Sequence, residues 1–253
     1  MRPAPVSELL LLAGPPFSGQ LWRGIQARWA GRLRAEVLDL FDPIPEDPTL
    51  DGLAARVAAA LAAARVPTGL VAHGTAVPVA IRAAVKARPP ALVLSDGPVT
   101  RLDPVLAALA AACRMPRLAA ETLLRPGFFE RWLSSSRGLR RAVVNPYVMD
   151  RDTVVALVDP LLRDPRTRLA LARFLGSLPA ALRSTPRYEG PTLLCWGEID
   201  RLYPARVADE ARLLLPGAVH DAIPGAEHLH PEERPWELAD RVEAWLQDPA
   251  TMT

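Results

Sequence analysis

The sequence has no large surplus of positive charge and no long apolar run, and these two shortages argue against two classes of partner. The chain has 30 basic and 28 acidic side chains, so its net charge is only +2. Lys86 is the only lysine, and the other basic side chains are arginines. Such a balance lacks the basic surplus that nucleic-acid-binding domains carry. No apolar stretch approaches the roughly 20 residues that a membrane-spanning helix needs. We therefore expect neither a nucleic-acid nor a membrane partner.

Cysteine and histidine are also scarce. Cys113 and Cys195 lie far apart within apolar stretches, where reduced, buried thiols are expected. The four histidines show no metal-ligand spacing with these cysteines, so we predict no metal site and no cofactor. The apolar run Leu9–Ala13 follows Glu8 and is too short for a signal peptide. We expect a cytoplasmic protein.

Apolar residues, by contrast, are plentiful, since half of the 253 residues are hydrophobic and 23% are charged. Short apolar runs bounded by turn residues alternate with longer helical patterns, which is typical of a parallel sheet flanked by helices. The sequence predicts an α/β fold with a mostly parallel sheet of about six strands. The predicted strands are Glu8–Leu12, Ala35–Leu40, Thr68–Ala72, Ala91–Leu94, Pro191–Trp196 and Ala218–Ile223. The clearest helices between them are Leu50–Ala64, Val79–Ala87, Arg206–Leu215 and Pro235–Gln247.

Residues 100–188 show helical periodicity without a strand pattern. We interpret them as a helical cap inserted into a core formed by residues 1–99 and 189–253. An insertion of this length usually covers a pocket. Its predicted helices are Leu102–Cys113, Arg117–Leu124, Asp152–Leu162 and Arg168–Leu182.

Ligands of such sheets bind beyond the carboxyl ends of the strands, which directs attention to the residues after each strand. Four of these junctions are informative: residues 13–17, 72–76, 197–204 and 224–230. Backbone N–H groups of the first turn, at Gly14 and Pro15, could face an anion or a developing oxyanion.

The junctions together resemble the α/β-hydrolase superfamily. The segment from Trp196-Gly197-Glu198 to Asp200, followed by 224–228 and 233–235, has the spacing with which that family presents an acidic residue and a histidine. The resemblance implies that Asp200 and His228 are the last two members of a catalytic triad. It also implies a sheet without the family's first two strands, because the chain begins almost at the strand that is usually third.

The nucleophile of that family has no counterpart here. Its elbow, G-x-S-x-G, corresponds to Ala72-His73-Gly74-Thr75-Ala76, with Gly74 in the place of serine. Glycine has no oxygen for attack, yet it tolerates the positive φ of the elbow. The N–H of Thr75 stays a candidate oxyanion donor. Thr75 as a displaced nucleophile is disfavoured, because its side chain leaves the elbow in another direction.

Aromatic residues supply the candidates for an apolar pocket, with packing inside the cap as the alternative role for those in the insertion. Packing at the entry of a helix is the alternative for His73. The pocket candidates are Phe17, His73, Phe128, Phe129, Trp132 and Tyr147.

Two further groups are polar. Arg137, Arg140 and Arg141 could bind a carboxylate or a phosphate, but a short arginine run in an arginine-rich chain is usually a solvated face. His220 and His230 are expected at the surface.

Two hypotheses of different classes follow. In the first, His228 supported by Asp200 acts as an acid–base catalyst without covalent catalysis on a small, mostly apolar carbonyl, ester or lactone compound. In the second, the chain is a catalytically inactive pseudo-hydrolase that binds a ligand or a protein, with a homodimer or protein partner at the open sheet edge. A deliberate change of residue 74 alone is disfavoured, because Ala72 and Ala76 have replaced the flanking glycines as well.

Overall fold

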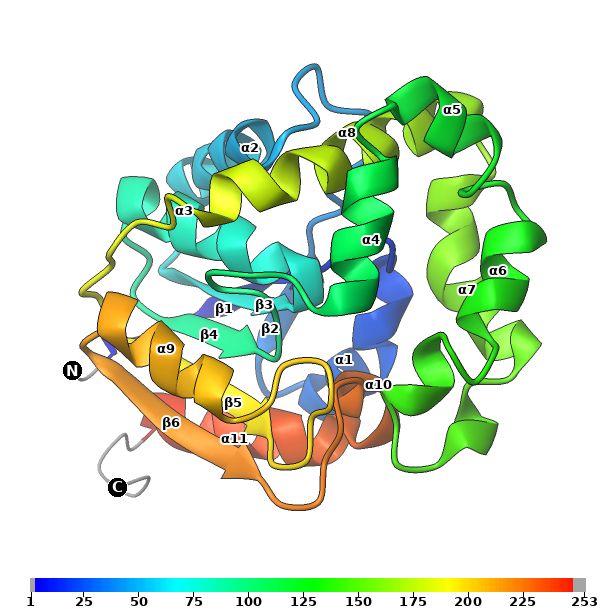
Figure 1. Cartoon of the computed structure of the whole chain (residues 1–253). Coiled ribbons are helices and arrows are strands. Elements are labelled where there is room, and N and C mark those ends of the chain that lie inside the picture. The colour runs from blue at the N-terminus through cyan, green and yellow to red at the C-terminus, as the bar shows by residue number, and fades with distance from the viewer. Residues whose placement is uncertain (1–2, 248–253) are drawn as a thin grey trace.

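The computed structural model describes residues 3–247, which contain one sheet of six parallel strands (Figure 1). In space the strands follow the order β2-β1-β3-β4-β5-β6, and each neighbouring pair is parallel. The predicted α/β sheet is therefore confirmed. The strands are β1 (Glu8–Ala13), β2 (Arg34–Val37), β3 (Thr68–His73), β4 (Leu92–Ser95), β5 (Thr192–Gly197) and β6 (Ala218–Ile223).

The inner strands differ from the edge strands in burial. Every residue of β3, β4 and β5 is buried, as expected for strands with helices on both faces. β2 alternates between exposed and half-buried residues, and its Arg34 pairs with Glu36. Charged side chains on an edge strand discourage pairing with another chain. Docking of a partner at a sheet edge stays a prediction.

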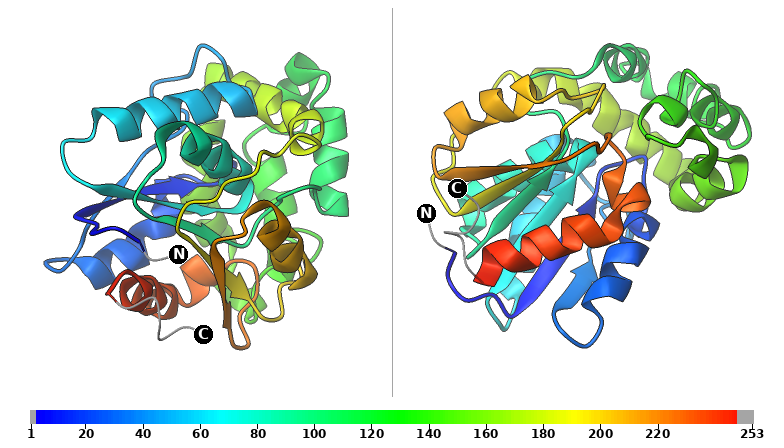
Figure 2. Two further views of the ribbon diagram at one scale, coloured as in Figure 1. Left: turned by 90° about the vertical axis from the view of Figure 1, so that its left-hand side faces the viewer. Right: turned by 90° about the horizontal axis from the view of Figure 1, so that it is seen from below.

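Helices cover both faces of the sheet (Figure 2). α1 (Arg23–Trp29) and α11 (Pro235–Gln247) pack together on one face. α2 (Leu50–Ala63), α3 (Val77–Ala87) and α9 (Arg206–Leu214) lie on the other. The starts of these helices have local causes: the Thr49 hydroxyl caps α2 by accepting from the Gly52 N–H, and α11 opens with proline in its first turn.

The residues between β4 and β5 are helical, and most of them lie beyond the carboxyl ends of the strands (Figure 1). α8 runs back across α2 and also contacts α4 and α5. The division at residues 100 and 188 into core and cap stays a prediction. The helices of this segment are α4 (Pro104–Ala112), α5 (Pro116–Glu121), α6 (Phe128–Leu133), α7 (Arg151–Leu162) and α8 (Pro165–Leu182), with short 3-10 turns η3 (Leu139–Arg141) and η4 (Pro146–Val148).

Three elements differ from the sequence prediction. β2 ends at Val37 rather than residue 40, because the chain turns where the Phe41 N–H donates to the Asp39 carboxylate. α6 and the one-turn α10 (His230–Glu233) were not predicted. Both are too short to show a helical repeat in the sequence.

One apolar core extends from the sheet into the surrounding helices, and four tryptophans are among its largest buried side chains. Both cysteines are buried and free, which confirms that prediction. Within residues 3–247, no helix combines the length and the apolar character needed to cross a membrane.

Candidate active site

The elbow between β3 and α3 is built around Gly74. Its backbone has a φ of +62°, and its N–H donates to the Asp96 carbonyl at 2.7 Å. A Cβ added at this position would have only the Gly14 Cα within 4 Å, at a distance of 3.9 Å. A side chain here would enter open space, so the positive φ is the main obstacle to any residue other than glycine.

The turn after β1 presses directly against this elbow. A Cβ on Gly14 would lie 2.4 Å from both the His73 carbonyl oxygen and the Thr75 nitrogen, so only glycine fits. The prediction of Pro15 as a backbone donor is wrong, because proline has no N–H. The Phe17 N–H in turn donates to the Gly14 carbonyl at 3.0 Å. The turn therefore offers few donors to an oxyanion.

Asp200 and His228 come together from the turns that follow β5 and β6. The His228 Nδ1 lies 2.9 Å from the Asp200 Oδ2, and both residues are buried. The Asp200 Oδ1 accepts from the backbone N–H groups of Leu202, at 2.7 Å, and Tyr203, at 2.9 Å. Burial alone would raise the pKa of Asp200, but attraction to His228 and hydrogen bonds from His228 and Asp96 lower it to about 2. An ionised Asp200 holds the proton on Nδ1 and leaves Nε2 available.

A second aspartate–histidine pair lies behind the first. The His230 Nε2 is 2.5 Å from the Asp96 Oδ2, and both side chains are fully buried. The Ser95 hydroxyl lies 3.1 Å from the His230 Nε2 and 3.1 Å from the His73 Nδ1. The His73 ring also packs against the first pair, because its centroid lies 4.9 Å from that of the His228 ring. The two pairs therefore belong to one buried cluster.

Burial shifts the pKa values of Asp96, His230 and His73 in the direction that favours their neutral forms. Burial, then the negative charge of Asp200 and a hydrogen bond with it, raise the pKa of Asp96 well above its ordinary value. Burial and the charge of His228 lower the pKa of His230 to about 3. Burial also lowers the pKa of His73, with smaller contributions from His228 and His230. The pKa of Asp96 is thus raised and that of Asp200 lowered, which favours a proton on Asp96 and a charge on Asp200.

Three groups of this cluster lie near enough together for a metal ion. Asp96, Asp200 and His228 each offer a ligand atom within 4.8 Å of the others. Backbone N–H groups already donate to both carboxyl groups, including that of Gly197 to the Asp96 Oδ1 at 3.0 Å. The His228 Nδ1 is committed to Asp200. The arrangement fits a hydrogen-bonded cluster better than a metal centre.

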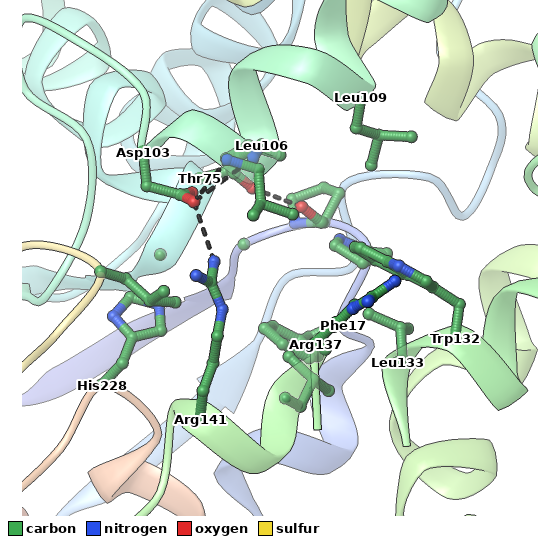
Figure 3. Close-up of a pocket in the computed structure, with 18 of the residues that line it drawn as sticks. Phe17, Thr75, Asp103, Leu106, Leu109, Trp132, Leu133, Arg137, Arg141 and His228 are labelled. Carbon is green, nitrogen blue, oxygen red and sulfur yellow. Dashed lines mark hydrogen bonds and ion pairs between the residues drawn. The ribbon is translucent and has the colours of Figure 1, made fainter. Parts of the chain in front are cut away.

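The cluster opens into a pocket with a cavity volume of about 90 Å³ (Figure 3). A single water needs roughly 10–15 Å³ on this scale, so the pocket admits a small molecule. Gly74, Thr75 and His228 lie in its wall. Most of the remaining wall is apolar, formed by Pro15, Pro16, Phe17, Val105, Leu106, Leu109, Phe129, Trp132, Leu133, Leu139 and Leu202.

The predicted aromatic residues divide into two groups. Phe17, Phe129 and Trp132 line the pocket, and the rings of the last two stack with centroids 5.6 Å apart. Phe128 and Tyr147 do not line it, since their exposed fractions are 51% and 83%. On α6, residues 129 and 132 share a face while 128 points elsewhere. His73 lies beneath the pocket, fully buried.

Several polar residues of the site escaped the sequence prediction. Asp96 directly follows β4, and the rule about strand ends could have found it. The prediction of a surface position for His230 is wrong, because α10 turns it into the buried cluster, whereas His220 on β6 is half-buried. Arg137 and Arg141 both line the pocket: Arg137 is also exposed to solvent, whereas Arg141 is half-buried and contacts Asp103 at 3.1 Å.

Sequence comparisons give little detail. No family model matches the chain. An uncharacterized hydrolase, YugF, from Bacillus subtilis (strain 168) is 26% identical over 125 residues. The match covers 47% of this chain and 45% of that protein, so it spans less than half of the relative's length.

Solved structures match much more of the chain. An alpha/beta hydrolase fold protein from Burkholderia ambifaria has a TM-score of 0.71 at 21% identity, over 95% of this chain and 91% of that chain. A thermophilic esterase from Thermogutta terrifontis has a TM-score of 0.70 at 20% identity, with coverages of 99% and 92%. The Cif epoxide hydrolase from Acinetobacter nosocomialis has a TM-score of 0.74 at 11% identity, with coverages of 96% and 83%. These similarities establish the fold.

Proposed function

We propose that this chain, which has the α/β-hydrolase fold, is an enzyme that uses His228 and Asp200 for acid–base catalysis without a nucleophilic serine. Its substrate is a small, mostly apolar carbonyl, ester or lactone compound. The observation that carries the proposal is the 2.9 Å contact between the His228 Nδ1 and the Asp200 Oδ2 at the wall of an apolar pocket.

In the proposed mechanism His228 accepts a proton through Nε2, because Nδ1 is committed to Asp200. The ionised carboxylate stabilises the imidazolium that forms, and its two backbone hydrogen bonds keep it fixed during the reaction. A positioned general base of this kind contributes about 10²–10⁴-fold to the rate.

Two types of reaction suit a base without a protein nucleophile. In non-covalent hydrolysis, His228 takes a proton from a water that attacks the carbonyl carbon, and the imidazolium then protonates the leaving oxygen. In lyase chemistry, His228 removes a proton from the carbon next to a carbonyl, the electron pair forms a double bond as the bond to a leaving oxygen breaks, and the imidazolium protonates that oxygen. In cyclase chemistry, the same carbon instead forms a bond to a second carbonyl carbon of the substrate, and the imidazolium protonates the resulting alkoxide. The open space beside Gly74 leaves room for the water or the substrate oxygen. The esterase and epoxide hydrolase among the similar structures are named for hydrolytic reactions, which favours the first type.

A second candidate function is binding without catalysis, as in a pseudo-hydrolase. Pro15 and Gly74 favour it, because together they remove a backbone donor and the serine hydroxyl from the places where the fold family carries them. The pocket and the buried cluster would then serve recognition only.

Turnover measurements with three proteins separate these candidates. We would assay short and medium acyl esters and lactones with the native chain, His228→Ala and the matched control His220→Ala, whose histidine does not line the pocket. We expect His228→Ala to lower kcat/KM by about 10²–10⁴-fold and His220→Ala to leave it unchanged. Equal turnover by all three proteins would contradict the role of His228. Silence of all three would favour the binding function.

A further inference from the structure

A half-buried cationic side chain lines the mostly apolar pocket. Arg141, the last residue of η3, lines the same cavity as His228, Thr75 and Phe17. Figure 3 shows its guanidinium beside the imidazole of His228, with the tip directed toward Asp103. A charged group in an apolar cavity is costly unless it has a partner, so its position calls for an explanation.

Asp103 fixes Arg141 without exhausting its hydrogen-bonding capacity. The Asp103 carboxylate is 5% exposed, caps α4 by accepting from the Val105 N–H at 3.0 Å, and accepts from the Arg141 Nη2 at 3.1 Å. Among residues 3–247 it is the only acceptor within hydrogen-bonding distance of this guanidinium. A guanidinium carries five N–H donors in a rigid fork, so several stay available to a ligand.

A second arginine adds an uncompensated positive charge at the same wall. Arg137 lines the pocket, and within the described chain no carboxylate lies at ion-pair distance from it. Arg137 and the neighbouring Arg140 are both exposed, but Arg140 does not line the pocket. Arg137 and Arg141 together outnumber the one acidic side chain in the wall, Asp103. The mouth of the pocket is therefore suited to an anion.

We infer that the ligand of this pocket carries a carboxylate that binds the free donors of Arg141, with Arg137 as the second cation. The inference rests on the proposed function for the reaction at His228, but it concerns recognition. Guanidinium and carboxylate form strong, charge-assisted hydrogen bonds with matching geometry. The apolar body of the ligand would occupy the wall formed by Leu106, Leu109 and Trp132, while Arg141 aligns it with His228.

Calorimetric titration with octanoate and octanamide tests the inference. The two probes share their chain length and differ in charge. We expect the native chain to bind octanoate about 10–100-fold more tightly than octanamide, the range for charge-assisted hydrogen bonds. Arg141→Gln should abolish this preference, Arg141→Lys should retain part of it, and the control Arg140→Gln should retain all of it. Circular dichroism would establish that each variant is folded.

Two results would overturn the inference: octanamide binding as tightly as octanoate, or equal losses of octanoate affinity in Arg141→Gln and Arg140→Gln. If Arg141→Gln fails to fold, Arg141→Lys and Arg137→Gln carry the test, because each should weaken octanoate and spare octanamide. Binding is measured without turnover, so an inactive His228 leaves this result intact. Conversely, if the chain turns over an ester or lactone but binds octanoate no more tightly than octanamide, the inference is wrong and the proposed function is still supported.

Discussion

The two halves of the pocket floor carry different chemistry. At the ends of β5 and β6, Asp200 and His228 are buried, hydrogen-bonded and backed by a second pair, Asp96 and His230. At the ends of β1 and β3, Pro15 lacks an N–H and Gly74 lacks a side chain, although Gly74 keeps a φ of +62°. The first half, which we call the retained half, holds acid–base groups. The second, which we call the depleted half, has an elbow-shaped backbone with no side chain at residue 74.

This contrast narrows the chemistry that the site can perform. A covalent acyl-enzyme needs a nucleophile at the elbow and hydrogen-bond donors for the oxyanion. The depleted half would have to supply both, but Gly74 has no side chain and Pro15 has no N–H. Proton transfer needs only an oriented imidazole with a carboxylate behind it, and both belong to the retained half. The difference between the halves therefore favours a reaction in which His228, supported by Asp200, transfers protons and no covalent intermediate forms.

The largest effect is expected from weakening the retained half. Asp200→Asn removes the negative charge that stabilises the His228 imidazolium. The asparagine amide can also donate to Nδ1, so the proton of the neutral imidazole is no longer confined to that nitrogen. We expect kcat on the best substrate of the panel to fall by about 10²–10⁴-fold, measured in steady state with little change in KM. Asp209→Asn, which alters an exposed carboxylate on α9, is the matched control. Native turnover in Asp200→Asn would show that the pair does not act as a unit.

A second effect concerns the Asp96–His230 pair, which lies behind the proposed catalytic pair. His230 has an ordinary pKa of 6.5 in the unfolded chain, and burial lowers its pKa to about 3 in the folded chain. Between these values the unfolded state binds more protons, so the free energy of unfolding falls as pH is lowered, at up to about 1.4 kcal/mol per pH unit. His73 contributes with the same sign, because its pKa is also lowered.

His230→Gln isolates this contribution, since its amide can replace the Nε2 contact but does not titrate. Urea unfolding at several pH values between 6.5 and 3 should give a flatter dependence for the variant than for the native chain. Asp96 acts in the opposite direction, because its raised pKa makes its contribution to stability fall as pH rises above the ordinary value of 3.8. Identical slopes for the two proteins would mean that His230 is protonated in the folded state.

The smallest expected effect is the difference in free energy of unfolding between alanine variants at the two glycines of the depleted half. Gly14→Ala places a Cβ 2.4 Å from two backbone atoms of the elbow and should cost about 3 kcal/mol or more. Gly74→Ala meets no atom closer than 3.9 Å, so only the positive φ opposes it, at about 1–2 kcal/mol. Urea unfolding of both variants checks the ranking. A larger loss for Gly74→Ala would mean that the space beside it is closed.

The sequence could predict Asp200 and His228 because each of them follows a strand of the predicted sheet. β5 is an apolar run, β6 is a mixed run that contains His220 and Asp221, and both are bounded by turn residues. Asp200 and His228 come at the junctions after them, where ligands of such sheets bind. The six strands were recognisable for the same reason, with β2 shortened where a turn began early.

What the sequence could not predict depends on tertiary contacts. His230 lies two residues after His228 in a polar stretch, and only the short α10 buries it against Asp96. Arg141 belongs to a short arginine run, a pattern that predicts a solvated face. In the structure, η3 places it opposite Asp103, which lies 38 residues away in the chain. Pro15 is a different case, since the absence of its N–H follows from the residue type alone.

Chemical modification mapped by mass spectrometry tests the contrast between the halves most directly. The native chain would be treated in parallel with diethyl pyrocarbonate, which acylates accessible imidazoles, and with a fluorophosphonate, which phosphonylates activated hydroxyls. We predict acylation of His228, protection of the buried His73 and His230, and no phosphonyl adduct anywhere in residues 72–76. A phosphonyl adduct on Thr75, or an unreactive His228 in the folded protein, would contradict the account.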